Sequence, residues 1–281
     1  MKHLLLNLKR FDITPERGGV NRIAPPARWG EAIVSGAQER LSAFAGHDAE
    51  FVMFFPEAHL ITAAAARTSG SPVQLGSQGV YRADTAPGGN FGAFTTNLTA
   101  NAAAQLGCGW ALIGHCEERA DKLDILARAG VAGGEAAAVV NKLLNEEVLR
   151  AQEAGMHVAY CIGEKSEEQD RWQEVLGAQL EEGLAGADLT RVVAAYEPVW
   201  SIGPGKTPAD APYIAKIARF IKSRLPVDVV YGGGLRADNA GMLAGIPEID
   251  GGLIALTRFA GEIGFYPEEY IEIIQLYLER G

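Results

Sequence analysis

The stretch from Val192 to Thr207 reads VVAAYEPVWSIGPGKT. An apolar run ends at Tyr196, a carboxylate follows at Glu197, and a loop rich in Gly and Pro comes next. A continuously apolar run of this length is typical of a strand in a parallel sheet, which is covered on both faces. The stretch therefore predicts a buried strand that presents Glu197 at its carboxyl end.

Similar apolar runs recur along the 281 residues, with helix-like stretches between them. The expected strands are Leu4 to Leu8, Phe51 to Phe55, Val73 to Gly76, Trp110 to Gly114, His157 to Ile162, Val192 to Tyr196, Val229 to Gly232 and Gly252 to Leu256. The expected helices are Arg28 to Ala45, Glu57 to Thr68, Ala100 to Leu106, Glu135 to Ala154, Glu167 to Ala185, Ala209 to Arg224, Asn239 to Leu243 and Pro267 to Leu278. Eight strands alternating with eight helices indicate a closed α/β barrel or a large doubly wound sheet.

The length favours the barrel, because one (β/α)8 barrel needs roughly 250 residues. No Ser- or Pro-rich linker interrupts the alternation, so we expect a single domain over residues 1–281. Three stretches, Asp12 to Pro26, Arg82 to Asn90 and Ala120 to Gly134, are interpreted as long loops or insertions.

The composition excludes several functional classes. With 35 acidic and 25 basic residues the net charge is −10, so we expect neither nucleic acid nor an anionic membrane as a partner. The N-terminus has no signal-peptide pattern, and no apolar run is long enough to span a bilayer. Cys108, Cys116 and Cys161 form no CxxC pair, which argues against a disulfide framework or a zinc knuckle and favours a cytoplasmic location.

Glu197 is the first candidate for chemistry. A carboxyl group among apolar neighbours such as Pro198 and Trp200 has a raised pKa, which suits a general base near neutral pH. The loop that follows has the composition of a lid that closes over a ligand. Alternatively, Glu197 is an exposed carboxylate and the loop an ordinary connection.

His115 follows another expected strand, in the segment Gly114-His115-Cys116-Glu117. The free backbone N–H groups of a helix that begins there disfavour imidazolium. A neutral His115 is able to donate a hydrogen bond to a substrate carbonyl that gains negative charge. A histidine with a purely structural role is the competing interpretation.

Two further groups of residues lie at expected strand ends. Strand alternation places Asn7 and Lys9 on one side of the first strand, where Lys9 needs an anionic partner such as a phosphate or an enediolate oxygen, or else reaches solvent. The glycine turns that contain Gly233, Gly234 and Gly251 lie at the last two strands, where barrels often bind phosphate through backbone N–H groups.

Together these segments resemble the triosephosphate isomerase family. That family has Asn-x-Lys on strand one, Gly-His-Ser-Glu after strand four and Tyr-Glu-Pro-Val-Trp-x-Ile-Gly-x-Gly-Lys on strand six; here Asn7-Leu8-Lys9, Gly114 to Glu117 and Tyr196 to Lys206 match. A histidine kept neutral by a helix N-terminus is itself a known feature of this family, so the resemblance implies the same state for His115.

The resemblance implies proton transfer through an enediolate with neither metal nor organic cofactor, on a phosphosugar, in a homodimer. It also implies a role for each matching residue. These roles are Glu197 as base, His115 as electrophile, Lys9 and Asn7 as oxyanion stabilisers, Glu117 as a further polar site residue, and Gly203, Gly233 and Gly234 as phosphate ligands.

The chain departs from the family pattern in several loops. Ala255-Leu256 stands where the family has Gly-Gly, Gly234 replaces a serine, and Cys116-Glu117-Glu118 replaces Ser-Glu-Arg. The leading hypothesis is interconversion of dihydroxyacetone phosphate and glyceraldehyde 3-phosphate. The altered loops leave two alternatives, which are an isomerase of a four-carbon phosphorylated ketose and a catalytically silent phosphosugar-binding barrel.

Overall fold

Eight parallel strands close into a barrel in the computed structural model, which describes residues 1–202 and 206–279. Each strand pairs with the next along the chain, and the last pairs with the first. The strands are β1 (Lys2–Asn7), β2 (Ala49–Phe55), β3 (Val73–Ser77), β4 (Cys108–Ile113), β5 (His157–Ile162), β6 (Val192–Tyr196), β7 (Asp228–Tyr231) and β8 (Gly251–Ile254). The predicted (β/α)8 barrel is confirmed.

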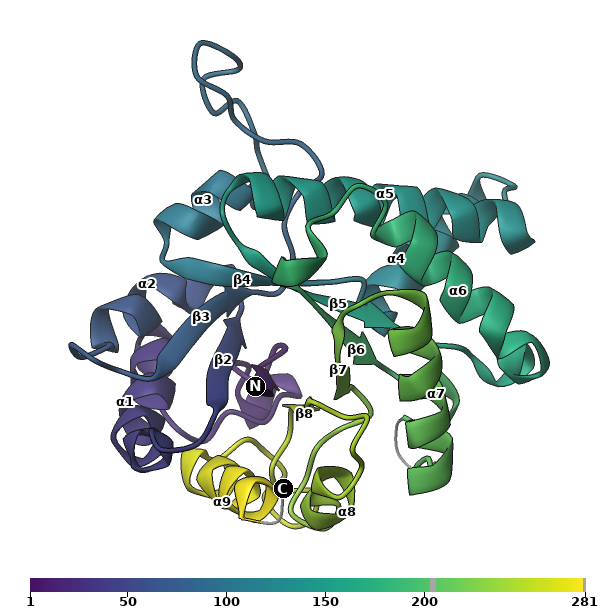
Figure 1. Ribbon diagram of the computed structural model, residues 1–281. Helices are drawn as coiled ribbons and strands as arrows, with labels where there is room; N and C mark the ends of the chain where they lie inside the picture. The colour runs from purple at the N-terminus through teal and green to yellow at the C-terminus, as the bar shows by residue number, and fades with distance from the viewer. Residues whose placement is uncertain (203–205, 280–281) are drawn as a thin grey trace.

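Helices form an outer ring around the barrel, as Figure 1 shows. They are α1 (Trp29–Leu41), α2 (Glu57–Ala66), α3 (Ala100–Gln105), α4 (Cys116–Arg128), α5 (Gly133–Glu153), α6 (Trp172–Gly183), α7 (Ala211–Arg224), α8 (Ala240–Ala244) and α9 (Pro267–Leu278). The prediction of a loop from Ala120 to Gly134 was wrong, because α4 occupies most of it. Within the described part of the chain, no helix combines the length and the apolar character needed to cross a membrane.

Both faces of the strands are buried, which explains their continuous apolar sequences. Leu5 points into the barrel interior, where it packs with side chains from most of the other strands. Leu4 and Leu6 lie on the opposite face, in the cluster between strands and helices. Alternate residues of one strand thus fill two separate cores, so neither face tolerates a run of polar residues.

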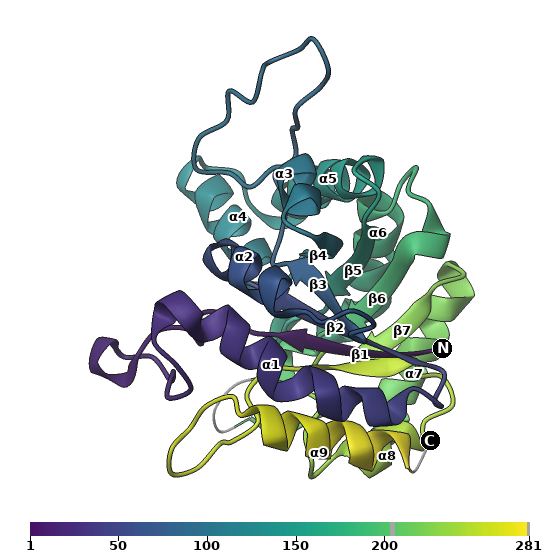
Figure 2. The ribbon, with the colours of Figure 1, turned by 90° about the vertical axis from the view of Figure 1, so that its left-hand side faces the viewer.

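The carboxyl ends of the strands lie on the left in Figure 2. Two long connecting segments extend beyond the barrel in this view. Residues 78–99 between β3 and α3 form an extended excursion, and the segment between β1 and α1 projects beyond the barrel (Figure 2). Arg22 of that segment donates to the carbonyl of Ile263 after β8 at 3.1 Å. The insertion predicted from Asp12 to Pro26 therefore packs beside the β8 loop.

A polar network closes the opposite, amino-terminal end of the barrel. His3 at the start of β1 is buried and lies 2.6 Å from Glu50 through Nδ1 and 2.9 Å from Asp228 through Nε2. Burial lowers the pKa of His3, but the hydrogen bonds and charges of Glu50 and Asp228 outweigh it, so the pKa lies above the usual 6.5. The folded protein therefore favours imidazolium at this position.

Replacing His3 with glutamine is expected to lower the free energy of unfolding by about 1.5–3 kcal/mol below about pH 6, the range for hydrogen bonds to charged groups. Because the folded pKa is raised, this contribution is complete at low pH and is lost as pH rises through the folded pKa. Urea unfolding of both proteins across pH measures it. A gap between them that widens with rising pH would contradict the network.

Candidate active site

Glu197 follows β6 directly and is almost completely buried, with 2% of its surface exposed. Its Oε2 accepts a hydrogen bond from the backbone N–H of Cys116 at 2.9 Å, and its Oε1 lies 3.2 Å from Nε2 of His115. Burial raises the pKa of Glu197 to about 7, although the Cys116 N–H and the charge of Lys9 act in the opposite direction. The carboxyl group is thus able both to accept and to return a proton near neutral pH.

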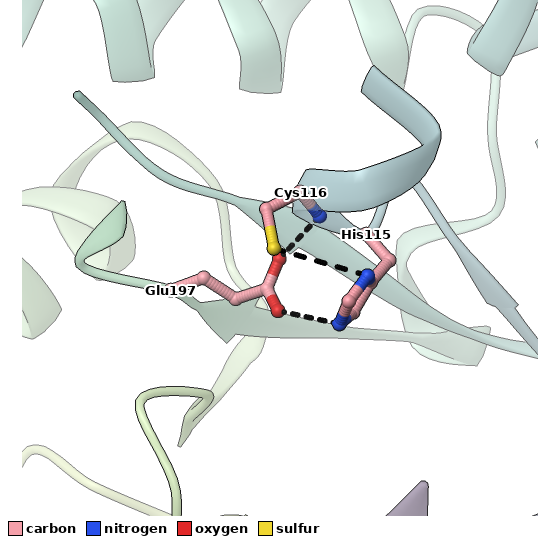
Figure 3. Close-up of side chains that lie close together, drawn as sticks. All are labelled: His115, Cys116 and Glu197. Carbon is pink, nitrogen blue, oxygen red and sulfur yellow. Dashed lines mark hydrogen bonds and ion pairs between the residues drawn. The ribbon is translucent and has the colours of Figure 1, made fainter. Parts of the chain in front are cut away.

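His115 caps the amino terminus of α4. Its Nδ1 accepts a hydrogen bond from the backbone N–H of Glu117 at 3.3 Å. A neutral ring that accepts at Nδ1 carries its proton on Nε2, the atom that faces Glu197 (Figure 3). Burial, and then the charge of Lys9, lowers the pKa of His115 to about 4. The imidazole is therefore neutral and presents an N–H donor to the site.

Lys9 lies in a turn just beyond the end of β1. The alternation of side chains along a strand, from which we expected Lys9 on the same side as Asn7, therefore does not apply to it. The strand ends at Asn7, and the backbone of Lys9 is left-handed, with a φ of 39°. Asn7 supports this turn by accepting the Lys9 N–H at 3.0 Å. The ammonium group then lies 3.3 Å from Oε1 of Glu117, which brings Glu117 to the same cluster.

Gln78, at the end of the third strand, was not predicted from the sequence. Its amide nitrogen donates to the carbonyl of Lys9 at 3.0 Å and also lies within 3.4 Å of Asn7 Oδ1 and the carbonyl of Phe54. Gln78 therefore fixes the turn that carries Lys9. Its position at an expected strand end was the available signal.

Arg119 was not predicted either, although it holds α4 against the barrel. Its guanidinium donates to the carbonyls of Gly114 and Cys161, both at 2.9 Å. It also donates to Asn141 at 2.9 Å and to the Tyr160 hydroxyl at 3.0 Å.

Gly114 has a φ of 81°, and a Cβ there would lie 2.9 Å from the Cys161 carbonyl. Arg119 and Gly114 together set the direction in which His115 leaves β4.

Replacing Arg119 with methionine is expected to lower the free energy of unfolding by about 1.5–3 kcal/mol, because it leaves the Gly114 and Cys161 carbonyls without their charged donor. Chemical unfolding compared with Arg128→Met measures the loss, since Arg128 is an exposed residue of the same helix. An equal effect of the two substitutions would contradict this role of Arg119.

The start of the loop after β6 is anchored on one buried carboxylate. Oε1 of Glu164 accepts hydrogen bonds from the Tyr196 hydroxyl at 2.9 Å, the Trp200 indole at 2.8 Å and the Tyr213 hydroxyl at 2.9 Å. These contacts join both ends of the loop to the end of β5. Gly203, a predicted phosphate ligand, lies outside the described residues.

The predicted glycine turn follows β7 at the same end of the barrel. Gly232 lies against Glu197, because a Cβ at residue 232 would be 2.8 Å from the Cγ of that glutamate. Gly234 has a φ of 100°, with open space where a Cβ would project. Asn239 fixes the turn by donating to the Gly234 carbonyl at 2.9 Å. The structure thus places Gly232 beside Glu197, with Gly233 and Gly234 next along the same turn.

Comparisons with known proteins place this geometry in a family. A family model described as triosephosphate isomerase matches residues 30–275. A triosephosphate isomerase of Marinobacter nauticus is 32% identical over 254 residues, covering 86% of this chain and 89% of that protein. The chain belongs to the triosephosphate isomerase family.

Other triosephosphate isomerases agree with this assignment. One from Halorhodospira halophila is 31% identical over 256 residues, covering 86% of this chain and 90% of that protein. The crystal structure of triosephosphate isomerase from Bartonella henselae has a TM-score of 0.70 and 22% identity, with 98% of each chain covered. The likeness to the Bartonella henselae structure shows that the barrel fold is shared.

The triosephosphate isomerase family model includes most of the candidate site. Glu197, His115, Glu117 and the glycines after β7 all lie within the matched residues 30–275, whereas Asn7 and Lys9 precede them. Cys116, where the quoted family pattern has serine, places its Sγ 3.8 Å from Nδ1 of His115 (Figure 3). The site therefore combines carboxyl and imidazole groups with a thiol.

Proposed function

We propose that this protein interconverts dihydroxyacetone phosphate and glyceraldehyde 3-phosphate, acting as a single barrel domain. One observation carries the proposal. Oε1 of Glu197, whose pKa is about 7, lies 3.2 Å from Nε2 of the neutral His115. Membership of an isomerase family and the names of its relatives support the same reaction.

Each group has one task in the proposed reaction. The Glu197 carboxylate removes a proton from C1 of dihydroxyacetone phosphate, and the electrons of that C–H bond form a double bond between C1 and C2. Negative charge then develops on the C2 oxygen, where the Nε2–H of His115 and the ammonium group of Lys9 stabilise it. Glu197 returns its proton to C2, and the proton of the C1 hydroxyl passes to the C2 oxygen, which completes the aldehyde.

The remaining residues bind and position the substrate in this proposal. Asn7 holds the turn of Lys9, and Glu117 pairs with the Lys9 ammonium group until substrate arrives. Backbone N–H groups at Gly233 and Gly234, together with Gly203, bind the phosphate. The overall negative charge of the protein makes such local donors necessary for an anionic substrate.

The open space beside Gly234 favours a second candidate substrate, a four-carbon phosphorylated ketose. A coupled assay that compares kcat/KM for three- and four-carbon ketose phosphates tests both candidates. We expect a higher kcat/KM for the three-carbon substrate. A higher value for the four-carbon sugar would make that sugar the proposed substrate. If neither substrate turns over and an enediolate mimic binds no tighter than substrate, the barrel is a binding protein.

We also propose a homodimer in the cytoplasm. Phe91 is 93% exposed on the projecting segment of residues 78–99, where Tyr81 and Phe94 pack edge to face. The three cysteines are free thiols, which suits a reducing compartment. Light scattering at the assay concentration tests the dimer, and a monomeric mass would contradict it.

A further inference from the structure

Three potential metal ligands meet at the centre of the site. His115, Cys116 and Glu197 each offer one ligand atom, and these atoms all lie within 4.8 Å of one another. His115 and Cys116 are adjacent at the start of α4, and Glu197 reaches them from the end of β6 (Figure 3). The geometry points to a site for a borderline-soft divalent cation, Zn²⁺, which blocks the protein by occupying Glu197 and His115 together.

The spacing of the ligands fits a tetrahedral zinc ion. Bonds of about 2.0–2.3 Å at tetrahedral angles separate neighbouring ligand atoms by roughly 3.5 Å. Sγ of Cys116 lies 3.8 Å from Nδ1 of His115, and a carboxylate oxygen of Glu197 lies within 4.8 Å of the ligand atoms of both residues. Glu117 pairs with Lys9, so the fourth position is left to water.

The chemistry of the ligands selects the ion. A thiol, an imidazole and a carboxylate together match Zn²⁺ or Cd²⁺, whereas Mg²⁺ and Ca²⁺ prefer oxygen ligands. Nδ1 of the neutral imidazole carries no proton, so an ion that binds there replaces the 3.3 Å hydrogen bond from the Glu117 N–H. The thiol releases its proton to solvent as the sulfur–metal bond forms, and Glu197 releases a second proton wherever its carboxyl group is protonated before binding.

The charges around the site allow a cation to bind. Lys9 opposes it, but the ammonium group of Lys9 is already paired with Glu117 at 3.3 Å. Glu197 and the newly formed thiolate of Cys116 supply two further negative charges. A Zn²⁺ ion therefore meets an excess of negative charge once the thiol is deprotonated.

The bound ion would act as an inhibitor, and this consequence rests on the proposed function. Glu197 cannot accept a substrate proton while its oxygens bind a metal. Zn²⁺ and substrate should therefore exclude each other. Cys116 is the residue that completes the set, because a serine hydroxyl is a poor ligand for a soft ion.

Titration of the full-length protein with Zn²⁺ and with Co²⁺ as a spectroscopic substitute tests the inference. We expect Zn²⁺ to inhibit isomerisation competitively, and Co²⁺ to give a thiolate-to-cobalt absorption band that fades when dihydroxyacetone phosphate is added. In Cys116→Ser and Cys116→Ala the band should be absent and the affinity for Zn²⁺ lower by about tenfold or more. Inhibition is measured against the metal-free rate of each variant.

Cys108→Ser is the matched control, because Cys108 is a buried thiol at the start of β4, at the opposite end of the barrel. It should keep both the band and the inhibition. A wild-type protein without the thiolate band, or a Cys116→Ser protein inhibited as strongly as wild type, would overturn the site. The band requires no turnover, so failure of the metal site is distinguishable from failure of the isomerase assignment.

Discussion

Replacing Glu197 with glutamine is expected to lower kcat about 10²–10⁴-fold, the usual contribution of a positioned general base. Glutamine has nearly the same size, and its amide oxygen still accepts the N–H of Cys116 that Glu197 accepts at 2.9 Å. The amide cannot take up a proton, so substrate binding should change much less than kcat. Steady-state kinetics on both triose phosphates measure the change.

Glu248→Gln is the control for this substitution, because Glu248 forms a surface ion pair with Arg219 away from the barrel mouth. It should leave kcat unchanged. If Glu197→Gln keeps kcat within a few-fold of wild type, Glu197 is not the base.

The same carboxyl group sets the expected pH dependence. Burial raises the pKa of Glu197 to about 7, and the ionised form is the base. In wild type, kcat/KM should therefore rise with pH and level off above a midpoint near 7, because the free enzyme must lose this proton to act. A profile without that midpoint would contradict the role of burial in tuning Glu197.

Replacing Lys9 with methionine is expected to lower kcat/KM about 10²–10³-fold, the range found on removing one donor to a developing oxyanion. Methionine keeps the length of the side chain and removes the positive charge. The charge of Lys9 also lowers the pKa of both Glu197 and His115. The midpoint of the pH profile should therefore move upward in the Lys9→Met protein.

Two further variants separate this effect from general damage. Lys9→Arg keeps the charge, so the pH midpoint should remain near that of wild type even where positioning is impaired. Lys142→Met removes an exposed lysine from α5 and should change neither rate nor midpoint. A Lys9→Met protein with a normal rate and an unshifted midpoint would show that Lys9 does not act on the reacting oxygen.

The sequence predicts the barrel well because a parallel strand covered on both faces must be apolar throughout. Eight such runs identify eight strands, and a polar residue immediately after a run, as at Glu197 or His115, marks the mouth. The glycines after β7 follow the same logic. These features arise from residues that are adjacent in the chain, so they can be recognised in a single sequence.

The sequence indicates the start of α4 but not its length, because the helix buries none of its residues fully and its sequence has little apolar periodicity. Polar contacts hold it instead. Arg119 donates to the barrel, and Lys122 lies 2.7 Å from Glu118 and 3.1 Å from Glu147 of α5. The contacts of Arg119 with Cys161 and of Lys122 with Glu147 join residues far apart in the chain. A single sequence does not reveal them, and the same is true of Gln78 beneath Lys9.

Isomerisation in D₂O followed by NMR tests the central claim, that Glu197 moves a proton by way of an enediolate. A carboxyl group that exchanges with solvent should deliver deuterium to the carbon that becomes protonated, and Glu197→Gln should abolish this labelling together with turnover. Turnover and labelling that persist at the wild-type rate in Glu197→Gln would contradict the account.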